Sequence, residues 1–164
     1  MKYFAYGSNM STRRLRDRVP SCEFVTTAKL SRHQLRFQKW SKDKSSKCDA
    51  FYTGADTDFV WGVVFNISAT EKTALDTAEG LGGGYNEKTV DLITATGEHL
   101  RAITYYADKS AIVKDLSPYT WYKDLVLNGA SEHGLPADYI ALSIKPVTAT
   151  KDPDANREKR NRFD

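Results

Sequence analysis

The 164-residue sequence predicts one α+β domain. Segments rich in β-branched and aromatic residues fill the first two thirds of the chain, whereas helical patterns gather toward its end. This separation is typical of an α+β fold, because parallel α/β folds alternate the two kinds of element along the chain. We expect the domain to span residues 1–150. Residues 151–164 are expected to form a charged, flexible tail, because the run Asp152–Arg162 mixes charges of both signs and lacks large apolar residues.

Seven segments are predicted to be strands because they alternate apolar and polar residues or form short apolar runs. They are Lys2–Tyr6, Phe24–Leu30, Gln34–Lys39, Ala50–Gly54, Phe59–Asn66, Thr89–Thr96 and His99–Ala107. Between the last two, Thr96-Gly97-Glu98 is typical of a hairpin turn. The polar stretch Ser41–Lys47 is expected to be a loop.

Capping patterns predict four helices, over about residues 12–18, 68–79, 117–128 and 136–145, the last ending before Pro146. The second has a capping box that begins at Ser68, and Gly80 suits the position just after its end. In the third, Ser117 is the expected N-cap and Pro118 the first helical residue. The first helix places a group of arginines on its solvent-exposed face, namely Arg13, Arg14, Arg16 and Arg18.

Composition argues against several classes of function. The net charge of +3 is close to balanced, so we expect no nucleic-acid partner. Cys22 and Cys48 make no disulfide framework, and with three scattered histidines they make no zinc pattern. We expect no metal and no cofactor. No apolar stretch is long enough for a signal peptide or a membrane span, which favours a cytoplasmic protein without a membrane partner.

The most informative segment is Tyr6-Gly7-Ser8-Asn9-Met10, which follows the first strand. Gly7 can adopt backbone angles closed to other residues, and Ser8 and Asn9 favour turns and helix N-caps. A turn that leads into a helix points several backbone N–H groups at one spot, where an anion such as a carboxylate can bind. The same residues also fit a plain strand-to-helix connection.

Glu79 is the candidate acid/base residue. A carboxylate in the last turn of a helix lies at the negative end of the helix dipole, which costs about 0.3–1 kcal/mol. That position is expected to raise its pKa and to suit it for proton exchange near neutral pH. The alternative is an ordinary surface glutamate. Asp76 lies one turn earlier on the same face and competes for the role.

Two tyrosines are further candidates. The glycine run Gly82–Gly84 is either a simple bend or a flexible lid that presents Tyr85 to a pocket. Tyr122 shares one face of the third helix with Tyr119 and Val126. It is therefore either a core aromatic residue or a pocket wall that offers its hydroxyl to a ligand.

Six motifs in one order resemble the γ-glutamylcyclotransferases, and the resemblance runs from residue 3 to about residue 146. The motifs are Tyr3-Phe4-Ala5-Tyr6-Gly7-Ser8-Asn9-Met10, Val60-Trp61-Gly62-Val63-Val64-Phe65, Leu75-Asp76-x-x-Glu79-Gly80, Gly84-Tyr85, Ser117-Pro118-x-x-x-Tyr122-Lys123 and Gly129-Ala130-x-Glu132-x-Gly134-Leu135-Pro136.

The resemblance implies a small mixed β-barrel flanked by helices, without a cofactor. It implies an enzyme, monomeric or homodimeric, that releases 5-oxoproline and a free amino acid or amine from a small γ-glutamyl substrate. Glu79 matches the family's acid/base glutamate, and Tyr6, Gly7, Ser8, Asn9 and Met10 match its substrate-binding loop. Tyr122 matches a pocket tyrosine, and Tyr85 an aromatic residue near the glutamate.

Within the resemblance, Asn9 argues against the glutathione-specific branch and Ser8 against the γ-glutamylamine branch. A branch that removes a γ-glutamyl protecting group during antibiotic biosynthesis shares the layout and stays open. A rival hypothesis of another class is a non-catalytic binding module on the same scaffold, because a fold does not fix a function.

Overall fold

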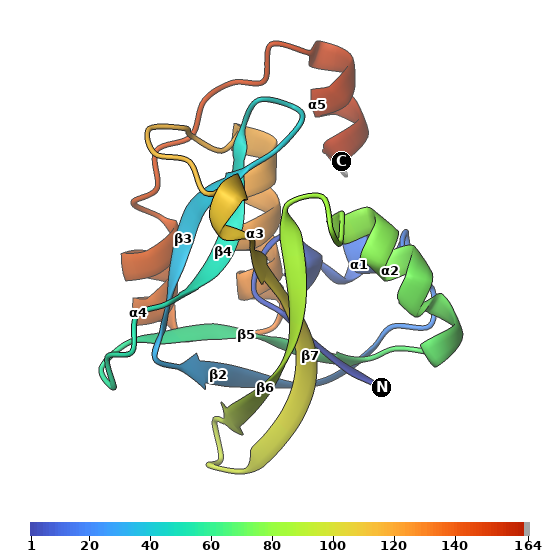
Figure 1. The fold of residues 1–164 in the computed structure, drawn as a ribbon, viewed down its shortest axis with the longest axis vertical. Coiled ribbons are helices and arrows are strands. Elements are labelled where there is room, and N and C mark those ends of the chain that lie inside the picture. Colours follow the sequence, from blue (N-terminus) through green and yellow to red (C-terminus); the bar gives the residue numbers. More distant parts are fainter. Residues whose placement is uncertain (163–164) are drawn as a thin grey trace.

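The computed structural model describes residues 1–162, and its centre is a closed five-stranded barrel. Figure 1 shows the barrel strands with the helices packed around them. Around the barrel the strands are β1 (Lys2–Ala5), β5 (Phe59–Asn66), β2 (Glu23–Ser31), β6 (Tyr85–Thr94) and β7 (His99–Ala107). Strand β1 pairs antiparallel with β5 and parallel with β7, so the barrel is mixed. The predicted barrel flanked by helices is confirmed.

A separate two-stranded sheet stands beside the barrel. It consists of β3 (His33–Trp40) and β4 (Ser46–Tyr52), paired antiparallel. This sheet contacts β5 and β7 and projects past the end of the barrel (Figure 1). It thereby brings the backbone of β4 close to the turn that follows β1.

All seven predicted strands are present. Phe59–Asn66 and His99–Ala107 have the predicted bounds, and the ends of the other five are shifted. The hairpin turn at Gly97 is confirmed, and its N–H donates to the carbonyl oxygen of Thr94 at 3.0 Å. Strand β6 begins at Tyr85 instead of Thr89, because its pairing with β7 extends to Tyr85 opposite Ala107. This longer pairing fixes the Tyr85 side chain on a strand instead of a mobile loop.

The first two helices follow the predictions closely. Helix α1 spans Thr12–Arg16, and the Ser11 side chain caps its first turn. Helix α2 spans Lys72–Glu79 after a 3₁₀ turn at Ala69–Glu71. It ends at Glu79, and Gly80 adopts the left-handed conformation expected of the residue after a helix.

Helix α3 spans Thr120–Glu132, so the predicted start at Ser117 and Pro118 is wrong. The carbonyl oxygens of these two residues accept hydrogen bonds from Ser46 N–H (3.1 Å) and Thr150 N–H (3.0 Å), which holds the segment extended. The predicted end is also wrong, because α3 continues past Gly129. An added Cβ at Gly129 would lie 2.5 Å from Ser11 N. The absence of a side chain at this position therefore allows α3 to pack directly on the turn that follows β1.

The C-terminal segment differs from the expected flexible tail over residues 151–162. After α4 (Ala137–Tyr139) and a π-helical turn at Ile140–Ile144, the chain returns and forms α5 (Ala155–Asn161). Asp152 is buried and accepts hydrogen bonds from Trp121 Nε1 (2.8 Å) and Arg157 Nε (2.7 Å). These polar contacts, and not apolar ones, hold the segment against the rest of the domain. The last two residues of the predicted tail lie outside the described part.

The barrel interior and the inner faces of the helices share one hydrophobic core. Its fully buried side chains include Phe4, Leu15, Phe65, Leu75 and Val126. Across residues 1–162, no helix has the length and apolar character needed to span a membrane.

Candidate active site

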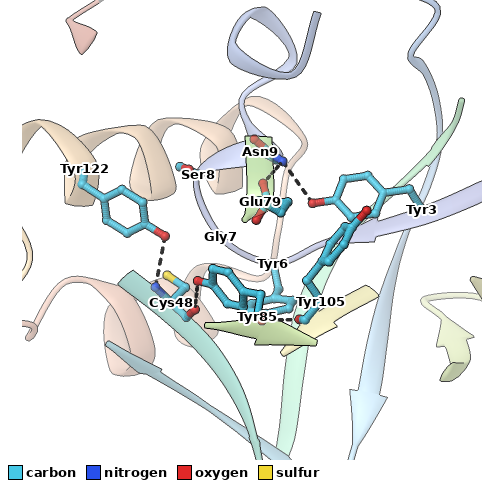
Figure 2. Close-up of a pocket in the computed structure, with 10 residues that line it drawn as sticks. All are labelled: Tyr3, Tyr6, Gly7, Ser8, Asn9, Cys48, Glu79, Tyr85, Tyr105 and Tyr122. Atoms are coloured by element: carbon cyan, nitrogen blue, oxygen red, sulfur yellow. Dashed lines mark hydrogen bonds between the residues drawn. The ribbon is translucent and has the colours of Figure 1, made fainter. Parts of the chain in front are cut away.

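A pocket opens at the end of the barrel where β1 runs into the 3₁₀ turn Ser8–Met10. Figure 2 shows its walls, which come from β1, that turn, β4, the end of α2, β6, β7 and α3. The residues that line it are Tyr3, Tyr6, Gly7, Ser8, Asn9, Cys48, Glu79, Tyr85, Tyr105 and Tyr122. Seven of the eight predicted site residues therefore meet in one pocket.

Met10 is the exception, and its predicted place in the site is wrong. Its side chain is fully buried in the core, where it packs beside Gly129 of α3. Its N–H donates to the carbonyl oxygen of Gly7 at 3.0 Å, so neither its side chain nor its amide faces the pocket. Met10 anchors the turn because a buried apolar side chain holds it against α3.

Glu79 points into the pocket and is held by two donors on one oxygen. Its Oε1 accepts from Asn9 Nδ2 at 2.6 Å and from Arg18 Nη1 at 3.0 Å. The same Arg18 nitrogen donates to Asn9 Oδ1 at 2.7 Å, which closes a triangle of three side chains. The guanidinium offsets the unfavourable end of the α2 dipole, because an opposite charge lies beside the carboxylate. The triangle fixes Oε1 and leaves Oε2 for a ligand.

Asn9 is a positioning residue within this arrangement. Its Nδ2 also donates to the Tyr3 hydroxyl at 3.1 Å, as Figure 2 shows. The side-chain amide thus uses both hydrogens and its oxygen on protein groups, and the residue is almost fully buried. It therefore sets the orientation of Glu79 and is not free to bind a ligand through its side chain.

Asp76 is excluded from the site by its contacts. It accepts from the Tyr105 hydroxyl at 2.6 Å and forms an ion pair with Lys72. Partial burial acts to raise the pKa of Asp76, but the hydrogen bonds from Lys72 and Tyr105 outweigh it and lower that pKa overall. Within residues 1–162, Glu79 is the single carboxylate that lines the pocket.

Gly7 leaves space that a side chain would fill. Its backbone angles, φ −114° and ψ −145°, lie outside the regular strand and helix regions, in line with the expectation for this glycine. An added Cβ would lie 3.2 Å from Cys48 Cβ and 3.3 Å from the Tyr122 hydroxyl. Beyond Gly7, the N–H groups of Ser8 and Asn9 begin the 3₁₀ turn and have no acceptor among the described residues.

Comparison with known proteins shows which family the chain belongs to. Residues 59–142 match the AIG2-like family. The human gamma-glutamylcyclotransferase is 33% identical over 144 residues, which cover 84% of this chain and 73% of the relative. The bovine enzyme of the same name is 31% identical with the same coverage.

The chain belongs to the gamma-glutamylcyclotransferase family. A solved gamma-glutamyl cyclotransferase has the same fold, with a TM-score of 0.85, 27% identity and coverage of 98% of this chain and 96% of the other. An uncharacterised human protein superposes with a TM-score of 0.84 and 28% identity over the same shares of the two chains. The chain is therefore an enzyme of this family, and the hypothesis of a non-catalytic module is not favoured.

Four residues of the candidate site were missed by the sequence analysis: Tyr3, Arg18, Cys48 and Tyr105. Arg18 was assigned to the solvent-exposed face of the first helix. The helix ends at Arg16, and the following turn directs Arg18 back to Glu79. Tyr3 stands in the opening motif, where alternation along a strand places it on the same face as Ala5. No sequence pattern indicates that Cys48 belongs to the site.

Cys48 organises the two candidate tyrosines through its backbone. Its N–H donates to the Tyr122 hydroxyl at 3.0 Å, and its carbonyl oxygen accepts from the Tyr85 hydroxyl at 2.5 Å (Figure 2). Tyr122 is thus a core aromatic residue with a backbone partner and at the same time a pocket wall. Burial raises the pKa of the Cys48 thiol to about 12, so the cyclotransferase carries it as a neutral group.

Tyr122→Phe should destabilise the cyclotransferase by about 1–3 kcal/mol, because the buried Cys48 N–H loses its acceptor. Urea unfolding monitored by fluorescence measures this free energy. Tyr119→Phe is the matched control, since the Tyr119 hydroxyl is a donor to the carbonyl oxygen of Asp43 at the partly buried surface. Equal stability of Tyr122→Phe and the wild type would contradict the structural part assigned to this hydroxyl.

Proposed function

We propose that this enzyme converts a γ-glutamyl amino acid into 5-oxoproline and a free amino acid. The observation that carries the proposal is the fixed Glu79 carboxylate, which lines the same pocket as the free N–H groups of Ser8 and Asn9. The names of the relatives support the same class of reaction.

The substrate supplies its own nucleophile. Its α-amine attacks the γ-carbonyl carbon, a new C–N bond closes the five-membered ring, and the original amide C–N bond breaks. Holding the substrate in the folded conformation supplies much of the rate, because oriented intramolecular reactions gain about 7–11 kcal/mol. The narrow walls formed by Tyr6, Tyr85 and Tyr122 fit this task.

Protons must move from the attacking nitrogen to the leaving nitrogen. The α-amine arrives as an ammonium and becomes an amide N–H, so it gives up two protons, and the leaving nitrogen gains two as it becomes an ammonium. Oε2 of Glu79 carries them one at a time, as base and then as acid. Arg18 and Asn9 keep Oε1 in place throughout, so the free oxygen stays aimed at the reacting nitrogens.

The substrate oxygens need hydrogen-bond donors. The N–H groups of Ser8 and Asn9 open the 3₁₀ turn without an acceptor among residues 1–162, and both residues line the pocket, so we propose that they hold a carboxylate or the developing oxyanion. The Tyr122 hydroxyl already accepts from Cys48 N–H, and its own hydrogen is the candidate donor to a second substrate oxygen.

The setting of the reaction is also a proposal. Cys22 and Cys48 are both free and buried, which fits a reducing compartment such as the cytoplasm. We propose that the substrate is a small molecule and that neither nucleic acid nor a membrane takes part.

Incubation of the purified protein with γ-glutamyl-alanine tests the proposed function. We expect equal amounts of 5-oxoproline and alanine, measured by mass spectrometry. α-Glutamyl-alanine is the matched control, because its amide is placed wrongly for closure of the same ring. Release of glutamate instead of 5-oxoproline would indicate hydrolysis and overturn the proposed reaction.

A further inference from the structure

Outside the catalytic pocket lies a second cavity that shares Ser8, Glu79, Tyr85 and Tyr122 with it. We call this cavity the outer cavity. It adjoins Glu79, so it offers space for the half of a substrate that leaves in the proposed reaction. Five cationic side chains line it: Arg14, Arg18, Lys39, Lys47 and Arg157.

Three of these cations are neutralised by carboxylates. Arg18 pairs with Glu79 at 3.0 Å, Lys47 with Asp43 at 2.7 Å, and Arg157 with the buried Asp152. Their charges are already balanced within the protein, so they contribute little net attraction for a ligand.

Lys39 is not balanced in this way. Only 8% of the residue is exposed, yet its ammonium has no carboxylate and no hydrogen-bond acceptor within residues 1–162. Its Nζ lies 4.5 Å from the centre of the Tyr85 ring, which is a weak substitute for an anion. A buried ammonium without an anion is costly, and burial lowers the pKa of Lys39.

Gly84, in the loop that joins α2 to β6, leaves room for the Lys39 side chain. An added Cβ at Gly84 would lie 2.9 Å from Lys39 Cε and 3.2 Å from its Nζ. The end of the Lys39 side chain therefore lies against the loop that joins α2 to β6, beside Tyr85 of the catalytic pocket.

Arg14 is the second unbalanced cation. Its Nη1 donates to the neutral Asn161 side chain at 3.0 Å, and its Nε is buried without a partner in the described chain. Burial, helped by the neighbouring Arg18, lowers the pKa of Arg14 to about 10. The outer cavity thus has two cations that form no ion pair with a carboxylate of residues 1–162, although Glu79 acts on both of them, and Asp43 on Lys39, from a greater distance.

We propose that the outer cavity binds the leaving amino acid through two carboxylates, so that the preferred substrates are γ-glutamyl dipeptides whose second residue is acidic. One carboxylate is the α-carboxylate that every leaving amino acid carries, and the other belongs to its side chain. Lys39 and Arg14 supply one cation for each. This proposal rests on the proposed function, because it names the substrate class of that site.

The test compares γ-glutamyl-glutamate with γ-glutamyl-glutamine, which have almost the same shape and differ by one charge. We expect kcat/KM for the acidic dipeptide to be higher by about tenfold or more, the scale of a hydrogen bond to a charged group. Lys39→Met should reduce this preference to about twofold or less. Lys42→Met is the matched control, because Lys42 is a nearby exposed lysine that does not line the cavity, and it should keep the preference.

The wild-type ratio needs no variant, so the proposal stays testable if Lys39→Met does not fold. Equal kcat/KM for the two dipeptides would overturn the substrate class while leaving the proposed function intact. A preference that Lys39→Met retains in full would overturn the assignment of the lysine. Release of 5-oxoproline from neither dipeptide nor from γ-glutamyl-alanine would overturn the proposed function and this inference together.

Discussion

Glu79→Gln should lower turnover of a γ-glutamyl dipeptide by at least about 10²-fold, the scale of lost general acid–base catalysis. Glutamine keeps an oxygen that can accept from Asn9 and Arg18, so the fold is expected to persist. Its amide cannot accept a proton from the substrate ammonium or return one to the leaving nitrogen. The initial rate of 5-oxoproline release, with circular dichroism as the check on folding, measures the effect.

The matched control is Asp76→Asn. Asp76 lies one turn earlier on α2 and does not line the pocket. Its carboxylate is held by Lys72 and by the hydroxyl of Tyr105, a residue of the pocket wall. This variant should lose stability and retain most of its turnover. If the two variants lost turnover equally, or if Glu79→Gln retained near-normal rates, the assignment of the proton carrier would fail.

Gly7→Val should reduce kcat/KM by about 10²-fold, because a displacement of about 1 Å at a reacting group has effects of that size. The first added carbon would lie 3.2 Å from Cys48 Cβ and 3.3 Å from the Tyr122 hydroxyl, and valine adds two more. Either the turn that carries the Ser8 and Asn9 amides or the Tyr122 ring must move. Steady-state kinetics on a folded variant separate the effects on kcat and KM.

Gly83→Ala is the control for this prediction. Gly83 does not have a positive φ, and an added Cβ there would meet only the carbonyl oxygen of Gly80 at 3.4 Å. Near-normal kinetics are expected for it. Wild-type kinetics in Gly7→Val would show that the turn is not the part of the site that holds the substrate.

Much of the fold could be predicted from the sequence, because local patterns specify it. Alternation of apolar residues located all seven strands, and Gly80 marked the end of α2. The start of α3 could not be located in this way, since Ser117 and Pro118 fit an N-cap locally. What holds them extended is pairing with Ser46 and Thr150, which are distant in sequence.

The residues of the candidate site fall into the same two groups, those with a local sequence signal and those without one. Glu79 and the opening turn have local signals, a carboxylate at a helix end and a turn-forming triplet. Arg18 and Cys48 have none, because they act through contacts with elements far along the chain. The docking of residues 151–162 was missed for a similar reason. A charged composition indicates a solvated segment, but it does not show that the buried Asp152 accepts hydrogen bonds from Arg157 and Trp121.

The position of β1 in the barrel has a consequence for biosynthesis. This strand is made before the strands it pairs with, because its neighbours are β5 and β7, and Tyr3 lies opposite Ile103. Contacts between residues so distant along the chain form late, since the intervening loop must close first. Tyr122 must also emerge from the ribosome before the Cys48 amide finds its acceptor. The pocket therefore cannot be completed during synthesis until the ribosome has passed Tyr122 and that residue has emerged.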